Sequence, residues 1–137
     1  MKQQGFTLVE ILIVMVIVGL GLMTVAPKLA ENTILSNKTE SFFDTIIENH
    51  LETAKELNTQ VFITGYKGSD NILLHSGERL NIPEGVVSQA QINDDSTGSS
   101  EFRIYFYPDG LFDHFRITFT NRSVLEGYPA LSRAVFK

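Results

Sequence analysis

The clearest hydrophobic pattern in the chain is an apolar run near its N-terminus. Residues 6–26 contain a single charged side chain, Glu10, and residues 11–27 contain none. A helix of 21 residues rises about 31 Å, close to the hydrocarbon thickness of a bilayer. The pattern therefore predicts one membrane-spanning helix, to which we assign residues 6–27.

A cleaved secretory signal is the alternative interpretation of a short apolar run that follows a positive start. Such a signal ends in small residues at a site of the A-x-A type. Residues 25–30 read Val-Ala-Pro-Lys-Leu-Ala and match that pattern poorly. A span that stays in the protein is therefore the favoured interpretation.

From Leu29 to about Asn58, apolar positions recur at intervals of three and four residues, which is typical of an amphipathic helix. A kink is expected at Pro27, but we still predict one long helix whose second part, residues 28–58, packs on a sheet. The lone histidine on the stripe is expected to be a core or rim residue rather than a ligand. The stripe contains Phe42, Phe43, Ile46, Ile47, His50, Leu51, Ala54 and Leu57.

Residues 59–137 show a period of two, which predicts strands. Residues 61–64 and 72–75 predict a hairpin with a turn between them. Residues 81–91 predict one or two more strands around Pro83-Glu84-Gly85. The last apolar segment, residues 134–136, is expected to close the sheet or to lie along its edge.

The strongest strand pattern lies in residues 101–107 and 111–120, which the turn-forming triplet Pro108-Asp109-Gly110 separates. We predict that these two segments form a hairpin with one core face. The expected fold class is α+β, with the long helix packed on an antiparallel sheet. The predicted core face carries Phe102, Ile104, Phe106, Leu111, Phe115, Ile117 and Phe119.

A specific motif precedes and enters the span. A short polar leader with one basic residue ends at Gly5, and Phe6, Thr7-Leu8-Val9-Glu10 and the apolar run follow. This order resembles the N-terminus of type IV pilins and type II secretion pseudopilins. The resemblance implies that a prepilin peptidase cuts between Gly5 and Phe6 and methylates the new N-terminal Phe6. Residues 1–5 would then be a leader peptide.

Two positions of the motif have a physical explanation of their own. Gly5 has no Cβ and suits a bond drawn out into a protease cleft, although an ordinary flexible tail would also accept glycine. Glu10 carries a charge into the span, which costs roughly 2.5 to 3.5 kcal/mol at the bilayer centre and less near an edge. The resemblance implies that Glu10 pairs with the freed amine of Phe6 of a neighbouring subunit. Snorkelling to water is the alternative.

Gly19, Gly21 and Pro27 are candidates for a segment where the span loosens. Each glycine weakens a helix by about 1 kcal/mol relative to Ala, and a proline inside a helix costs about 3 kcal/mol. The resemblance implies that residues 19–27 melt when the helix leaves the bilayer. Membrane helices in general also contain Gly and Pro more often than soluble ones.

Composition and charge restrict the rest of the chain. Its 137 residues, 43% of them apolar, leave one small domain of about 110 residues after the span, residues 28–137. From Lys28 onward the net charge is −5, which makes nucleic acid an improbable partner. The chain has no cysteine, so no disulfide framework is expected. Lys2 ahead of the span predicts a cytoplasmic N-terminus and a periplasmic domain.

No pattern for catalysis or for a cofactor is found. Asp113 and His114 are adjacent on a predicted strand and should point to opposite faces, and no G-x-S-x-G sequence is present. The histidines lack the spacing of a zinc site. Residues 93–98 are acidic but lack the calcium-loop spacing, so a solvated flexible loop is expected. We expect neither an enzyme nor a metal or cofactor.

Residues 102–110 and the run of the helix into residues 61–63 look like the H-type minor pseudopilin of type II secretion and the related T-type minor pilins. Residues 131–134 depart from that pattern, because a Gly-Arg-containing strand is common there. The resemblance implies a subunit of the pseudopilus tip that works in protein export from the inner membrane. Its partners would be prepilin peptidase, other pseudopilins, the inner-membrane assembly platform and an exported protein substrate.

Two alternatives remain open at this point. In the first, the chain is a minor pilin of a type IV pilus, including the DNA-uptake kind. A basic stripe near the C-terminus would favour this alternative, and Arg122, Arg133 and Lys137 form only a thin one. The second alternative belongs to another class: a single-pass membrane sensor or ligand-binding protein whose leader is never cut.

Overall fold

The computed structural model describes residues 5–137, so most of the predicted leader and Lys2 lie outside the described residues. The chain divides into two compact units, one ending at Ile34 and the other comprising Leu35–Lys137. A single helix, α1, runs from Leu8 to Leu57 and contributes to both units. The prediction of one long helix is therefore confirmed, with Pro27 inside it.

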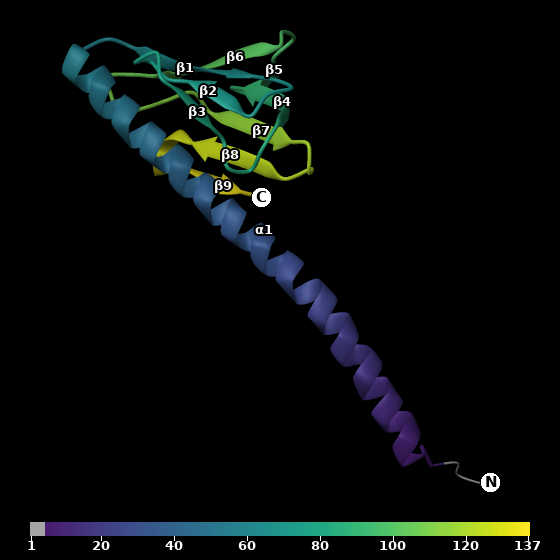
Figure 1. Ribbon diagram of the computed structural model, residues 1–137. Helices are drawn as coiled ribbons and strands as arrows, with labels where there is room; N and C mark the ends of the chain where they lie inside the picture. The colour runs from purple at the N-terminus through teal and green to yellow at the C-terminus, as the bar shows by residue number, and fades with distance from the viewer. Residues whose placement is uncertain (1–4) are drawn as a thin grey trace. The chain divides into compact units, whose positions relative to one another are not determined.

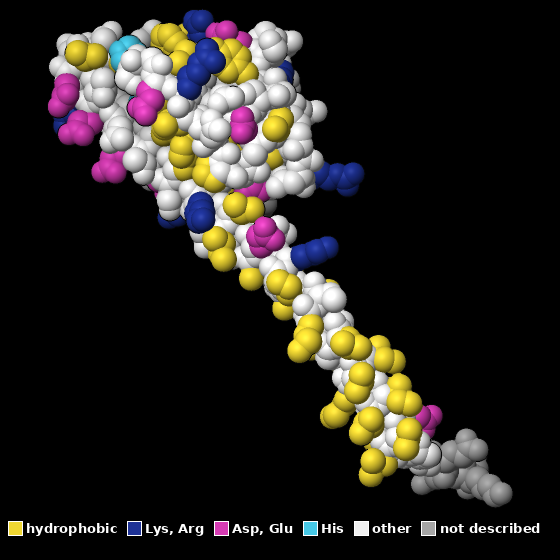
Figure 2. Space-filling view, in the orientation of Figure 1, with side chains coloured by type: hydrophobic (Ala, Val, Ile, Leu, Met, Phe, Trp, Pro, Cys, Tyr) yellow, Lys and Arg dark blue, Asp and Glu magenta, His cyan; other side chains and the backbone are white. Residues whose placement is uncertain are grey.

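In the first unit the helix is apolar and its side chains lie on the surface. An 18-residue window of α1 reaches a mean hydropathy of 2.7, and none of that window is buried. Hydrophobic side chains cover the visible face of this segment (Figure 2). By length and composition, this helix can cross a membrane once, as predicted.

In the second unit the strands form two sheets, whereas the sequence suggested one. Every pairing is antiparallel, and the strands lie over the C-terminal half of α1 (Figure 1). The first sheet has the order β3(Arg79–Asn81), β2(Asn71–Leu73), β1(Val61–Tyr66), β6(Glu101–Phe106). The second has the order β5(Asp95–Ser96), β4(Val87–Ile92), β7(Phe115–Phe119), β8(Val124–Tyr128), β9(Arg133–Phe136), with a short 3₁₀ helix, η1(Pro129–Leu131), before β9.

The predicted hairpin of residues 101–107 and 111–120 is wrong. The turn itself forms, because Gly110 N–H donates to Tyr107 O at 3.1 Å and Tyr107 N–H donates to Leu111 O at 2.8 Å. Beyond the bridge between Phe106 and Phe112, however, β6 pairs with β1 and β7 pairs with β4 and β8. Alternation marks which face of a strand is buried but does not select its partner.

One predicted core position is also wrong, because the chain passes from one sheet to the other between β6 and β7. Phe112 is 3% exposed and Leu111 is 50% exposed, the reverse of the expected faces. The alternation of β7 begins only at Phe115, so it does not extend back to Leu111. The other strand predictions hold: β1 and β2 form the hairpin, β3 and β4 flank residues 82–86, and β9 closes the edge.

The amphipathic part of α1 packs on the strands largely as predicted. Its buried side chains are Thr39, Phe43, Ile46, Ile47, His50 and Ala54. Leu57 is the exception at 57% exposed, because the helix ends there in a Schellman motif. Asn58 takes φ 50°, its N–H donates to Lys55 O, and Thr59 N–H donates to Ala54 O at 3.1 Å.

Aromatic side chains fill the core between α1 and the sheets. Phe43 of α1 lies 5.8 Å from Phe115 of β7, measured between ring centroids. Two glycines make room for such rings: a Cβ on Gly65 would lie 2.2 Å from the Phe102 ring, and one on Gly127 would lie 2.1 Å from the Phe115 ring. Each pair is a direct cross-strand pair, so an aromatic side chain covers the strand backbone where glycine leaves it bare.

Candidate functional site at the N-terminal segment

The start of α1 is a reciprocal capping box built by Thr7 and Glu10. Thr7 lies just before the helix, and its backbone N–H and Oγ1 both donate to Glu10 Oε2 at 3.2 Å. Glu10 N–H donates back to Thr7 Oγ1 at 3.3 Å. These contacts satisfy backbone donors that a helix N-terminus otherwise leaves without partners, and the carboxylate also lies at the positive end of the helix dipole.

The capping box was not predicted, although the pattern Thr7-x-x-Glu10 before an apolar run is a readable signal for it. The local structure therefore gives Glu10 a role inside its own chain. Its predicted pairing with the freed amine of Phe6 on a neighbouring subunit stays a prediction. The two roles do not exclude one another, because a carboxylate has two oxygens and the capping box uses only Oε2.

The structure brings Gly5, Phe6 and Glu10 together around one open depression that Thr7 also lines. Gly5 and Phe6 precede the helix in non-helical backbone, and Phe6 is 80% exposed. No atom lies within 4 Å of the position of a Cβ on Gly5. Both residues of the predicted cut are thus exposed, and the capped helix starts two residues beyond Phe6.

Gly19, Gly21 and Pro27 all lie within α1. Thr24 Oγ1 donates to Gly21 O at 2.8 Å, a contact of the kind that bends helices. Pro27 has no N–H, so the helical hydrogen bond to the carbonyl four residues earlier is lost. No atom lies within 4 Å of a Cβ position on either glycine. These features support a weak segment, and its melting stays a prediction.

The second unit has a polar cluster on the outer face of its five-stranded sheet. Its centre is Glu126, which is 3% exposed, forms an ion pair with Lys137 Nζ at 2.6 Å, and accepts from His114 Nε2 at 2.8 Å and Arg116 Nη2 at 3.2 Å. Burial alone raises the pKa of Glu126, but hydrogen bonds from Lys137, His114, Arg116 and Tyr128 outweigh it and hold the pKa at about 2. The cluster ties the C-terminal residue to β8.

Asp113 and His114 do not act on one another. Asp113 is buried and accepts from Tyr105 N–H, Tyr107 OH and Asn93 Nδ2, each at 3.1 Å. His114 contacts Glu126 instead. The two side chains have separate partners and therefore make no catalytic pair.

In the acidic segment, residues 93–96 form the turn and the short second strand of a hairpin, which corrects the expectation of a flexible loop there. Asn93 and Asp94 have φ 51° and 68°, as in a type I′ turn, and connect β4 to β5. Asn93 Oδ1 accepts from His114 N–H at 3.0 Å, which fixes the turn. Within residues 5–137, no group of three or more His, Asp or Glu side chains is placed to hold a metal ion.

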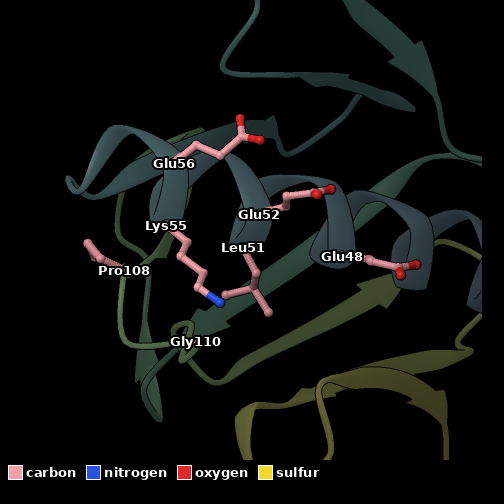
Figure 3. Close-up of a pocket in the computed structure, with 7 residues that line it drawn as sticks. All are labelled: Glu48, Leu51, Glu52, Lys55, Glu56, Pro108 and Gly110. Atoms are coloured by element: carbon pink, nitrogen blue, oxygen red, sulfur yellow. The ribbon is translucent and has the colours of Figure 1, made fainter.

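A hollow beside α1 is lined by Glu48, Leu51, Glu52, Lys55, Glu56, Pro108 and Gly110. In Figure 3, Leu51 and Lys55 extend from the helix toward the strands beneath it, whereas the carboxylates of Glu52 and Glu56 point away from them. The acidic groups therefore do not converge on one point. The hollow shows no arrangement for acid–base chemistry or for ion binding.

Comparison with known proteins gives one match. The family model described as the prokaryotic N-terminal methylation motif matches residues 1–26. No curated protein and no solved structure gives a significant match. The motif supports a type IV pilin-like protein, that is, a pilin or pseudopilin. It implies processing by a prepilin peptidase and assembly with other pilins, and with the apolar part of α1 it suggests membrane anchoring.

Proposed function

We propose that this chain is a minor pseudopilin, a structural and non-enzymatic subunit of a type II secretion pseudopilus that works at its tip in protein export. The observation that carries the proposal is the methylation motif set on an uncovered apolar helix. Gly5 and Phe6, between which we propose the cut, are exposed, and Glu10 lies beside them. A plain membrane anchor needs none of these three features.

In the proposed assembly, prepilin peptidase removes residues 1–5 and methylates Phe6. Residues 6–27 span the inner membrane with the N-terminus in the cytoplasm, and residues 28–137 face the periplasm. The freed amine of Phe6 is a cation for Glu10 of a neighbouring pilin or pseudopilin, and pairing lowers the cost of a charge in an apolar setting. The uncovered apolar helix packs among helices of other subunits, and Gly19 to Pro27 loosens as the subunit leaves the bilayer.

The inner-membrane assembly platform and an exported protein are the further partners that we propose. A tip subunit needs a folded head that meets other proteins, and Leu35–Lys137 is such a unit.

A clean deletion in the native host tests the branch of the family. Secreted proteins and surface pili are scored in the same strain, with the parent gene restored on a plasmid as the control. Lost secretion with normal pili supports the pseudopilin proposal. Lost pili, motility or DNA uptake with normal secretion overturns it in favour of a minor pilin of a type IV pilus.

A further inference from the structure

His50 is the buried titratable side chain that joins α1 to the turn between β2 and β3. Its exposed fraction is 6%. Nδ1 lies 2.8 Å from Ile46 O, one turn back on the same helix, and His75 N–H donates to Nε2 at 3.4 Å. The His50 ring also lies 5.2 Å from the Phe106 ring of β6, measured between centroids.

These two hydrogen bonds admit only one protonation state of His50. Because the carbonyl oxygen of Ile46 can only accept, Nδ1 must carry the proton. Because the backbone N–H of His75 can only donate, Nε2 must be unprotonated. That is the neutral imidazole with its proton on Nδ1. A second proton on Nε2 would point at the N–H of His75, turning an attraction into a repulsion.

The groups around His50 oppose its protonation as well. Burial lowers the pKa of His50, the hydrogen bond to Ile46 O raises it, and the charge of His75 lowers it, with a lowered pKa as the net result. The turn between β2 and β3 also carries Glu78, which lines the same hollow as His50 but is exposed to solvent. From β6 the neighbour is Phe106, which does not titrate.

His50 also lines a hollow between α1 and the β2–β3 turn. The hollow has apolar walls from Phe42, Ile46, Leu74 and Leu80. Leu74 N–H donates to Glu78 O and Gly77 N–H donates to Leu74 O, so the turn is a small closed unit. If the hydrogen bond from His75 N–H to His50 Nε2 breaks, the turn is no longer joined to the His50 side chain.

We propose that His50 is a pH-sensitive latch: its protonation releases the β2–β3 turn from α1 and opens the apolar hollow. The device is separate from the proposed assembly role and requires nothing of the N-terminal segment. A head that faces the periplasm would respond to acid outside the inner membrane. The direction is fixed, because the latch is closed at neutral pH and opens as the pH falls.

Hydrogen exchange of the His75 amide tests the latch in the full chain held in detergent micelles. After correction for the intrinsic dependence of exchange on pH, opening should rise about tenfold for each pH unit below the pKa of His50 in the open state. Amides in the middle of β7 should show no such rise in opening. A His75 amide whose corrected protection is constant from pH 7 to 5 overturns the proposal.

Two variants separate the latch from general acid effects. His50→Gln keeps an acceptor oxygen for His75 N–H but does not titrate, so its His75 amide should exchange with no pH dependence beyond the intrinsic one. His75→Gln removes the neighbouring imidazole, and the pH dependence should remain. If His50→Gln does not fold, an NMR titration of the His50 ring in the parent chain decides, because a latch requires the ring signals and the residue 75 amide to change at the same pH.

Discussion

The backbone N–H of Ala134 donates a 2.8 Å hydrogen bond to Oδ1 of Asp44, which joins the edge strand β9 to helix α1 across 90 residues of sequence. One helical turn earlier, Glu40 Oε1 accepts from Phe136 N–H, also at 2.8 Å. β9 is the last strand of its sheet, and these are N–H groups on the side away from β8. The helix carboxylates thus satisfy donors that an edge strand otherwise exposes to other chains.

Loss of this cover should destabilise the head. Asp44→Ala leaves the Ala134 N–H without its charged acceptor, and we expect a loss of about 1–3 kcal/mol in the free energy of unfolding. Glu40→Ala should act in the same direction. Urea unfolding followed by circular dichroism measures both. Glu48→Ala is the matched control, because Glu48 lies next in the four-residue row and is exposed. An equal loss in the control would contradict this role.

A methyl group at Gly127 should also be costly. Its Cβ would lie 2.1 Å from Phe115 Cε1, so the ring would have to move inside a packed core. We expect Gly127→Ala to lower the free energy of unfolding by about 1–3 kcal/mol. Gly98→Ala is the control, since nothing lies within 4 Å of the added Cβ. A Gly127→Ala chain as stable as the control would show that the core accommodates the methyl group.

The Glu126 cluster predicts a separate loss of stability in acid. The pKa of Glu126 is lowered from 4.5 to about 2 on folding, so the folded chain binds fewer protons than the unfolded one. Its contribution is complete above pH 4.5 and disappears as the pH falls toward 2. The free energy of unfolding, measured from pH 7 to 2.5, should therefore fall more steeply with decreasing pH below 4.5 in the parent chain. Glu126→Gln should be less stable at pH 7 and lack that added slope, and an unchanged slope would refute the assignment.

Thr7 and Glu10 allow the cap and the assembly charge to be tested apart. Glu10→Gln keeps a side chain that suits the third position of a capping box but removes the charge. We expect it to keep the helix start and to lose co-purification with other pilins. Thr7→Val keeps the carboxylate and removes the hydroxyl, which should cost about 0.5–2 kcal/mol at the helix start. Thr7→Ser is its control. Normal assembly of Glu10→Gln would rule out the charge pairing.

The sequence was informative wherever one local rule determines the structure. The apolar length of the span, the three- and four-residue spacing around Phe43 and the turn at Pro108-Asp109-Gly110 each need only neighbouring residues. The partner of β6 was not predictable in this way, because Phe102, Ile104 and Phe106 suit any strand that offers a buried face.

Strand β8, which lies between β7 and β9, shows why a weak pattern can still be a strand. Glu126 and Gly127 break the alternation of apolar residues in Val124–Tyr128, so this segment gave only a weak signal. In the fold, Lys137 and Arg116 form ion pairs with Glu126, His114 also contacts it, and the Phe115 ring covers Gly127. Both compensations come from residues distant in sequence, and no local rule predicts them.

The most direct test of the central claim is a mass measurement of the native N-terminus, on protein purified from the membranes of its own host. The account predicts a chain that begins at Phe6 and carries one N-methyl group. A chain that retains Met1 through Gly5 would contradict it and would favour a single-pass sensor or ligand-binding protein. Gly5→Leu, which adds a bulky side chain at the proposed cut, is the control and should leave the leader in place.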